Sequence, residues 1–328
     1  MLKRSIKMKT EYADDLRVVA DLPAFIFFTI SLGFFIILPL LISSDYFLHI
    51  LTHVVIYSIG VLGQNLLIGY TGLISFGQAG FIAVGAYSFA HTVSKIGLIP
   101  AIIVSGTISA LIGAIVGIPS LRVKGPFLAI ITLGFSIATF QIIQNTPQIS
   151  GGRMGMHIPK SWGVDSDLEI YYLSLILAYV FFFVGYRIVK SHIGKIFVAI
   201  RDSDIAAETL GINVAKYKIL SFAISSFYTG AMGGLYAYFM GYLEPTMFQI
   251  TESIYMFAAI VIGGIGSVFG SILGSAFVIS IPQIFVFMRE YTPLILSILI
   301  IVVMIFEPLG LYGVWLRIKL YFMNFPFR

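Results

Sequence analysis

The sequence predicts an all-α fold class: a polytopic transmembrane helical bundle of about ten spans, with glycine-broken helices and both termini in the cytoplasm. Hydrophobic residues make up 59% of the 328 residues and charged residues only 11%, whereas soluble domains carry roughly 25% charged residues. The mean hydropathy of +0.99 agrees with this difference. The few charged residues also leave long uncharged runs between them. Since a membrane span needs about 20 apolar residues, these runs predict where the spans lie.

The uncharged runs give the spans in chain order. We expect one span in each of the runs 22–44, 96–121, 125–152, 170–186, 219–243 and 291–306, and two spans in each of the longer runs 46–94 and 253–288. The first run is too long for a signal-peptide core and no small-residue cleavage site follows it. No Asp, Glu, Lys or Arg lies within a span predicted in this way. A proton-driven or charge-coupled carrier therefore has no obvious acidic site.

Lys and Arg residues predict the orientation, because they stay on the cytoplasmic side of the membrane near span ends. They gather in the segment 1–21, in the loop 187–218 and in the tail 307–328. All three segments are expected to be cytoplasmic, with the membrane domain in 22–306. The net charge of +5 then reflects topology and contact with lipid headgroups. Without a basic stripe that includes aromatic residues, we expect no nucleic-acid partner.

The loop 187–218 is a polar island in an otherwise apolar chain. Asp202 or Ser203 can cap the start of a helix, and Gly211 can end it in the left-handed conformation. The expected helix has about two turns, which is marginal in water without support. We infer that the flanking spans hold it and that it docks on another protein, where a transporter would receive mechanical force.

Two glycine-rich segments are expected to interrupt helices within the membrane. Residues 64–80 combine four glycines with polar side chains, and residues 263–270 form a second, similar segment. Broken backbone at membrane depth is tolerated only where it is buried in protein or lines a cavity, and half-helix N-termini favour a solute carboxylate. The resemblance between the two segments is a weak indication of internal duplication. The predicted translocation pathway consists of Gln64, Asn65, Tyr70, Thr71, Gly72, Ser75 and Gln78.

Several chemistries are absent from the sequence or disfavoured by it. The chain has no phosphate-binding Gly-x-x-x-x-Gly-Lys-Ser/Thr loop, so it does not bind ATP in that way, and it has no cysteine. His49 and His53 share a helix face but lack a third ligand, which favours interfacial histidines over a metal site. Residues 151–155 are expected to form a tight turn. Small residues such as Gly230 and Gly234 are expected to pack helices closely.

Four ordered motifs resemble the branched-chain amino acid ABC transporter permeases of the LivM type, in the hydrophobic amino acid uptake permease family. The motifs are NLLIGYTGLISFGQAGF at 65–81, FLAIITLG at 127–134, AIRDSDIAAETLGIN at 199–213 and PLGLYG at 308–313. The resemblance implies a permease subunit in a prokaryotic cell (inner) membrane. Its implied partners are a second, LivH-type permease, two cytoplasmic ATPases and an extracytoplasmic solute-binding protein. ATP would be bound by the partner subunits, and this chain would need no cofactor.

The resemblance also implies a role for the loop 187–218 as the ATPase-coupling segment. Ala206, Ala207 and Gly211 match the Ala-Ala-x-x-x-Gly part of the general importer loop, while Ile205 replaces the Glu of that pattern. The expected ATPase-coupling residues are Arg201, Asp202, Asp204, Ala206, Ala207, Glu208 and Gly211. The implied mechanism is ATP-driven switching of access, with no enzyme activity in this subunit.

Other functions remain open at this point. The same family resemblance extends to permeases for urea or short amides. An autonomous channel or facilitator would need no coupling helix, which the loop 187–218 argues against. An intramembrane enzyme would need clustered Ser, His or acidic residues at depth, and the sequence has no such cluster in its predicted spans.

Overall fold

A computed structural model describes residues 35–36, 38–39, 44–121, 123, 125–159, 163–164, 166–284, 291–307, 310–314 and 317. The predicted head 1–21 lies outside these residues, as do most of the predicted first span and most of the tail. The structure is helical, apart from a two-stranded antiparallel pair in which β1 (Met156–His157) faces β2 (Tyr242–Leu243). The all-α prediction is therefore confirmed for the described part of the chain.

Helices occupy the positions of the second to tenth predicted spans. They are α3 (Asp45–Asn65), α4 (Gln78–Ile96), α5 (Leu98–Gly117), α6 (Pro126–Asn145), α8 (Asp167–Lys190), α11 (Val214–Met240), α12 (Ile250–Gly263), α13 (Val268–Ile284) and α14 (Thr292–Phe306). The connecting elements are η1 (Leu66–Tyr70), η2 (Ile118–Leu121), α7 (Pro147–Ser150), η3 (Gly152–Met154), α9 (His192–Asp202), α10 (Asp204–Thr209) and η4 (Pro245–Phe248). The uncharged runs therefore located these helices correctly.

Five helical stretches are long and apolar enough to cross a membrane. They are Asp45–Tyr70, Leu98–Leu121, Pro126–Asn145, Asp167–Lys190 and Ser297–Val314. The helices of the run 253–288 are shorter, with 14 residues in α12 and 17 in α13. At about 1.5 Å per residue, α12 extends over roughly 21 Å, less than the roughly 30 Å of a bilayer core. The total of ten spans and the position of the termini stay predictions.

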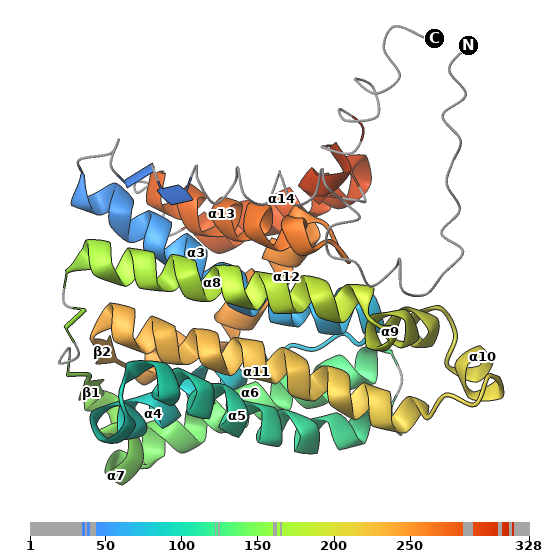
Figure 1. Cartoon of the computed structure of the whole chain (residues 1–328), viewed down its shortest axis with the longest axis horizontal. Coiled ribbons are helices and arrows are strands. Elements are labelled where there is room, and N and C mark those ends of the chain that lie inside the picture. Colours follow the sequence, from blue (N-terminus) through green and yellow to red (C-terminus); the bar gives the residue numbers. More distant parts are fainter. Residues whose placement is uncertain are drawn as a thin grey trace, which may run out of the picture.

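The long helices lie side by side and run between the two ends of the bundle (Figure 1). The short helices α9 and α10 form one end, and β1, β2 and α7 lie at the opposite end. Near that opposite end, Gly151, Gly152 and Gly155 all have positive φ, which confirms the predicted turn. The loop 187–218 and the turn 151–155 therefore lie on opposite sides, as the predicted topology requires.

Helix α11 lies at the centre of the packing, where small residues allow close approach. A β-carbon at Gly230 would overlap Ser109 of α5, and one at Gly234 would meet Ser105 Oγ at 2.6 Å. On the other side, a β-carbon at Gly85 of α4 would overlap the carbonyl oxygen of Gly230. The packing role predicted for Gly230 and Gly234 is confirmed.

We predict that Gly85→Ala destabilises the bundle, because the added methyl group would separate α4 from α11. Overpacking of this kind costs typically about 1–3 kcal/mol. Gly134→Ala is the matched control: Gly134 lies in α6, is exposed, and has no neighbouring atom within 4 Å of the place where the alanine methyl group would lie. The measurement is the midpoint of thermal unfolding of the purified protein in detergent. Equal midpoints for the two variants would contradict the close contact.

Candidate functional site

The first predicted break is a real interruption of the helix. Helix α3 ends at Asn65 and continues as the π-helical turn η1. Residues 72–77 are then non-helical, and α4 begins at Gln78. Gly72 has φ +74°, which lies in the region that only glycine adopts readily. The second predicted break is also present, between the end of α12 at Gly263 and the start of α13 at Val268.

Asn65 joins the two breaks. Its Nδ2 donates to the carbonyl oxygen of Ser267 at 2.8 Å and to Ser271 Oγ at 3.0 Å. Its Oδ1 accepts a hydrogen bond from the backbone amide of Gly266 at 2.8 Å. The side chain is fully buried. Asn65 thereby pairs the Gly266 amide, which lies in the second break outside both helices, and binds the Ser267 carbonyl at the start of α13. Pairing of this kind is the condition for broken backbone inside a membrane protein.

Glycine brings the two breaks into direct contact. A β-carbon at Gly69 would overlap the backbone nitrogen of Gly266. Together, residues 64–78 and 263–271 form one packed unit, which we call the break junction. The sequence indicated each break separately but not their contact, because the two segments are about 200 positions apart.

The other predicted pathway residues also lie in or beside the break junction. Gln64 Nε2 donates to the carbonyl oxygen of Ser75 at 3.2 Å. Gln78 connects to α11, donating to Ser225 Oγ at 3.3 Å and accepting from Thr229 Oγ1 at 2.7 Å. The pathway residues that are buried are Gln64, Asn65, Thr71, Ser75 and Gln78, while Tyr70 is half-buried and Gly72 exposed. In this conformation the buried polar side chains bind protein groups, and their role in a pathway stays a prediction.

The loop 187–218 contains the expected two-turn helix. It is α10, capped by Ser203, whose Oγ accepts from the backbone amide of Ala206 at 3.2 Å. Gly211 follows with φ +79°. A second helix, α9, precedes it and was not predicted. Its signal is present in the sequence, because Ile196, Phe197 and Ile200 are spaced to share a helix face, and all three are buried.

Helix α10 is fixed to the bundle by one apolar contact and one ion pair. Ala207 is buried in a cluster with Ile196, Ile200 and Val214. Lys218 Nζ of α11 lies 2.7 Å from Asp204 Oδ2, with 7% and 24% of the two side chains exposed. These contacts attach α10 to both α9 and α11.

The remaining predicted coupling residues lie on the surface of this end. Arg201, Asp202, Ala206, Glu208 and Gly211 are exposed. Large apolar side chains accompany them: Ile205 is 70% exposed and Leu210 is 78% exposed. Exposed apolar residues rimmed by charged ones are typical of a protein interface.

Arg201 connects this surface to the break junction. Its guanidinium donates from Nη1 to the carbonyl oxygen of Gly69 at 2.9 Å. The same side chain pairs with Asp202 Oδ1 at 3.2 Å and packs beside Gly72. A hydrogen bond with a charged donor is stronger than one between neutral groups. One direct bond therefore joins the end of α9 to the first break.

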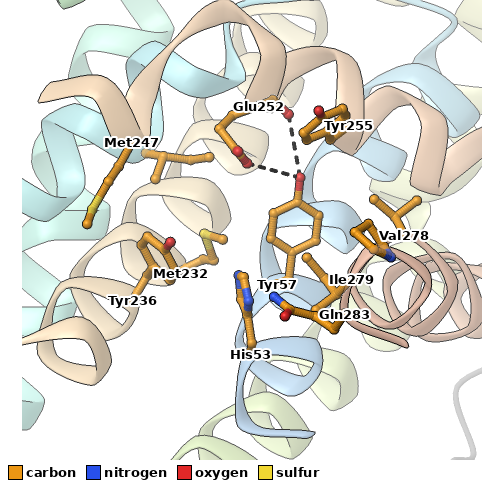
Figure 2. Close-up of a pocket in the computed structure, with 12 residues that line it drawn as sticks. His53, Tyr57, Met232, Tyr236, Met247, Glu252, Tyr255, Val278, Ile279 and Gln283 are labelled. Atoms are coloured by element: carbon orange, nitrogen blue, oxygen red, sulfur yellow. Dashed lines mark hydrogen bonds between the residues drawn. The ribbon is translucent and has the colours of Figure 1, made fainter. Parts of the chain in front are cut away.

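A cavity of about 270 Å³ lies between α3, α4, α11, α12 and α13 (Figure 2). Its lining residues are His53, Tyr57, Ile82, Met232, Tyr236, Met247, Glu252, Tyr255, Val278, Ile279, Pro282 and Gln283. None of the seven predicted pathway residues is among them. The cavity is thus separate from the polar cluster that the sequence indicated.

Glu252 is an acidic residue that lies within a helix of the bundle, just outside the predicted uncharged run. The uncharged run began at Ser253, but α12 begins at Ile250, so Glu252 lies in its first turn and points into the cavity. The Tyr57 hydroxyl lies 3.5 Å from Glu252 Oε2 and from its carbonyl oxygen. A span boundary that is placed at a charged residue leaves that residue outside the span, even where the fold places it inside the bundle.

The two histidines of α3 pack against aromatic rings. His53 stacks on Tyr236 with ring centroids 5.3 Å apart, and His49 lies 4.5 Å from the ring of Phe239. Among the residues that the structure describes, no group of three His, Cys, Asp or Glu side chains could hold a metal ion. The two histidines of α3 therefore pack against aromatic side chains of α11.

Comparisons with known proteins agree with this architecture. The high-affinity branched-chain amino acid transport system permease protein LivM of Salmonella typhimurium is 32% identical over 292 residues, covering 80% of this chain and 69% of that protein. LivM of Escherichia coli is 31% identical with the same coverage. The probable branched-chain amino acid transport permease protein LivH of Methanocaldococcus jannaschii is 25% identical over 284 residues, or 79% of this chain and 89% of that protein.

No solved structure matches the chain significantly. The family model described as branched-chain amino acid transport system / permease component matches residues 46–306. This range contains both breaks, the loop 187–218 and the cavity. Together with its apolar helices, the match identifies the chain as a membrane-embedded protein that belongs to the family of branched-chain amino acid transport system permease components.

Proposed function

We propose that this chain is a transmembrane permease subunit of an ATP-driven ABC importer for the branched-chain amino acids leucine, isoleucine and valine. The names of its LivM relatives support the solute class. The proposed location is a prokaryotic cell (inner) membrane, with the loop 187–218 in the cytoplasm. ATP is hydrolysed by partner subunits in this proposal, since the chain has no phosphate-binding loop of its own.

The observation that carries the proposal is the bond from Arg201 to the Gly69 carbonyl oxygen. A partner ATPase that moves α10 also moves α9, because Ala207 packs against α9. Arg201, at the end of α9, then moves the Gly69 backbone in the break junction. The Lys218–Asp204 pair extends the same movement to α11. A channel or facilitator would have no use for this connection.

We assign the break junction the role of the cytoplasmic gate. It is closed here by the three hydrogen bonds of Asn65. Each hydrogen bond contributes roughly 0.5–1.5 kcal/mol net, and one to a charged group about 1.5–3. With the bond from Arg201 to Gly69, they contribute together roughly 3–7.5 kcal/mol, a range that includes the roughly 5.5 kcal/mol that shifts a two-state equilibrium from 1:99 to 99:1. Opening the junction in this proposal therefore requires a partner that supplies energy of this size.

The proposed assembly contains a second permease of the LivH type, two cytoplasmic ATPases and an extracytoplasmic solute-binding protein. The similarity to a LivH protein over 79% of this chain supports a second permease of similar architecture. The exposed residues around α10 would contact one ATPase. The opposite end of the bundle, around β1 and β2, would face the binding protein.

Solute uptake by the reconstituted assembly tests this function. Vesicles would contain this chain, its companion permease, the ATPases and the binding protein, and would be supplied with labelled leucine or labelled urea. We expect leucine uptake that requires ATP. Uptake of urea alone would replace the solute class with urea or short amides, and uptake by this chain without ATPases would establish a facilitator instead.

We predict that Arg201→Gln uncouples ATP hydrolysis from uptake. Loss of the charged bond to Gly69 removes about 1.5–3 kcal/mol, so leucine uptake per ATP hydrolysed should fall about tenfold or more. Lys195→Gln, at an exposed lysine six residues earlier on the same helix α9, is the matched control and should leave the ratio unchanged. An unchanged ratio in Arg201→Gln would show that the bond transmits no movement.

We also predict that Ile205→Glu and Leu210→Glu weaken binding of the ATPases. Both side chains are exposed in the isolated subunit, so the change should leave its folding intact. Central apolar contacts of an interface contribute about 1–2 kcal/mol or more, so the amount of ATPase that copurifies should fall several-fold. Met154→Glu, 87% exposed at the other end, is the control. Equal copurification of all three variants would argue against a docking role for α10.

A further inference from the structure

The cavity beside Glu252 has the size and position of a solute site. Its volume of about 270 Å³ is close to the lower end of small-molecule pockets, which begin at roughly 300 Å³. Tyr57 precedes Asn65 by eight residues on α3, so the cavity wall lies about 12 Å along the helix from the break junction. From Asn65 to Tyr57, helix α3 leads away from α10. The cavity therefore lies on the far side of the proposed gate from the cytoplasm.

We propose that this cavity binds the transported amino acid and that the Glu252 carboxylate binds its α-ammonium group. The inference rests on the proposed import function and extends it, because it places recognition of the solute within the permease itself. The bound species is a zwitterion with a branched apolar side chain. The cavity wall has groups that suit each of its three parts, the ammonium group, the apolar side chain and the carboxylate.

The first match is the carboxylate of Glu252. Among the described residues, no Lys or Arg forms an ion pair with it. The Tyr57 hydroxyl is 3.5 Å away, beyond the usual 2.5–3.0 Å of an O–H···O bond, so within the described residues the carboxylate has one weak side-chain donor. An ionised carboxylate inside an apolar bundle is costly unless it is paired. An ammonium group from the solute would supply the missing partner.

The second match is apolar. Met232, Met247, Val278 and Ile279 line the cavity from α11, η4 and α13, and Figure 2 shows Met232 and Met247 on one side with Val278 and Ile279 on the other. Methionine side chains adapt to differently shaped neighbours. Such a wall accepts leucine, isoleucine and valine without a fixed fit to one of them.

The third match is a set of hydrogen-bond donors for the solute carboxylate. Tyr236 and Tyr255 line the cavity near Glu252, together with the amide of Gln283. These neutral donors can hold a carboxylate without adding a buried charge. Urea and simple amides have no ammonium group and gain little from Glu252. An acidic residue at this position therefore favours an amino acid over urea.

Photolabelling of the complete assembly tests the site. The probe is a leucine analogue with a diazirine in the side chain and both charged groups intact. Illumination followed by mass spectrometry should place the label on the cavity-lining residues of α11, η4 or α13, and excess leucine should suppress it. Labelling that leucine does not suppress, or that lies only outside the cavity, would overturn the proposed site.

Glu252→Gln tests the carboxylate, with Asp45→Asn, at an exposed carboxylate in the first turn of α3, as the matched control. Replacing a charged hydrogen bond with a neutral one should weaken labelling and leucine uptake about tenfold. ATP hydrolysis stimulated by the binding protein reports whether the assembly that carries Glu252→Gln is intact, so it should stay within about twofold of the parent. Asp45→Asn should behave like the parent in all three measurements.

The outcomes separate this inference from the proposed function. If the parent assembly imports leucine with ATP but Glu252→Gln imports and labels equally well, the carboxylate does not bind the solute and the import function stands. If the parent assembly imports no leucine, the proposed function itself fails. Loss of labelling in Glu252→Gln with rescue by Glu252→Asp would confirm that the negative charge is the feature required.

Discussion

The structure depends on one constraint, that polar backbone inside a membrane bundle must be paired. Asn65 meets this constraint for the second break with both ends of its amide. An apolar residue at this position would leave the Gly266 amide and the Ser267 carbonyl without this partner. The glycines at 69 and 266 then allow the two backbones to touch. Because one side chain satisfies a segment about 200 positions away, the two breaks form one unit.

Charge and hydropathy predicted where the helices lie, because both report whether a segment can be placed in lipid. The cap at Ser203 and the glycine at 211 similarly predicted α10, since capping is a local interaction. Contacts between distant segments are not local. The sequence therefore did not reveal that Asn65 binds residues 266–271. An amide side chain looks the same in the sequence whether it binds a neighbouring helix or lines a passage. The sequence alone therefore could not distinguish these two roles for Gln64 and Gln78.

Glu252 and α9 were missed for different physical reasons. Glu252 borders the uncharged run 253–288 on its N-terminal side. A span boundary placed at a charged residue always assigns that residue to water. The fold instead starts α12 within the bundle, so the residue at the boundary becomes part of a cavity wall. Helix α9 was missed because its apolar residues lie among charged ones, in a loop assigned to the cytoplasm. Its buried face is explained by packing on α10 and α11.

The proposed gate and the proposed solute site divide the bundle into two functional layers. Alternating access requires that a solute site communicates with only one side of the membrane at a time. In this proposal the bonds of Arg201 and Asn65 close the layer next to α10, and the cavity lies beyond that layer. Helix α3 contributes to both layers through Tyr57 and Asn65. In this proposal, a movement that Arg201 passes through η1 to the end of α3 reaches the cavity wall along α3, and so links release of the solute to opening of the gate.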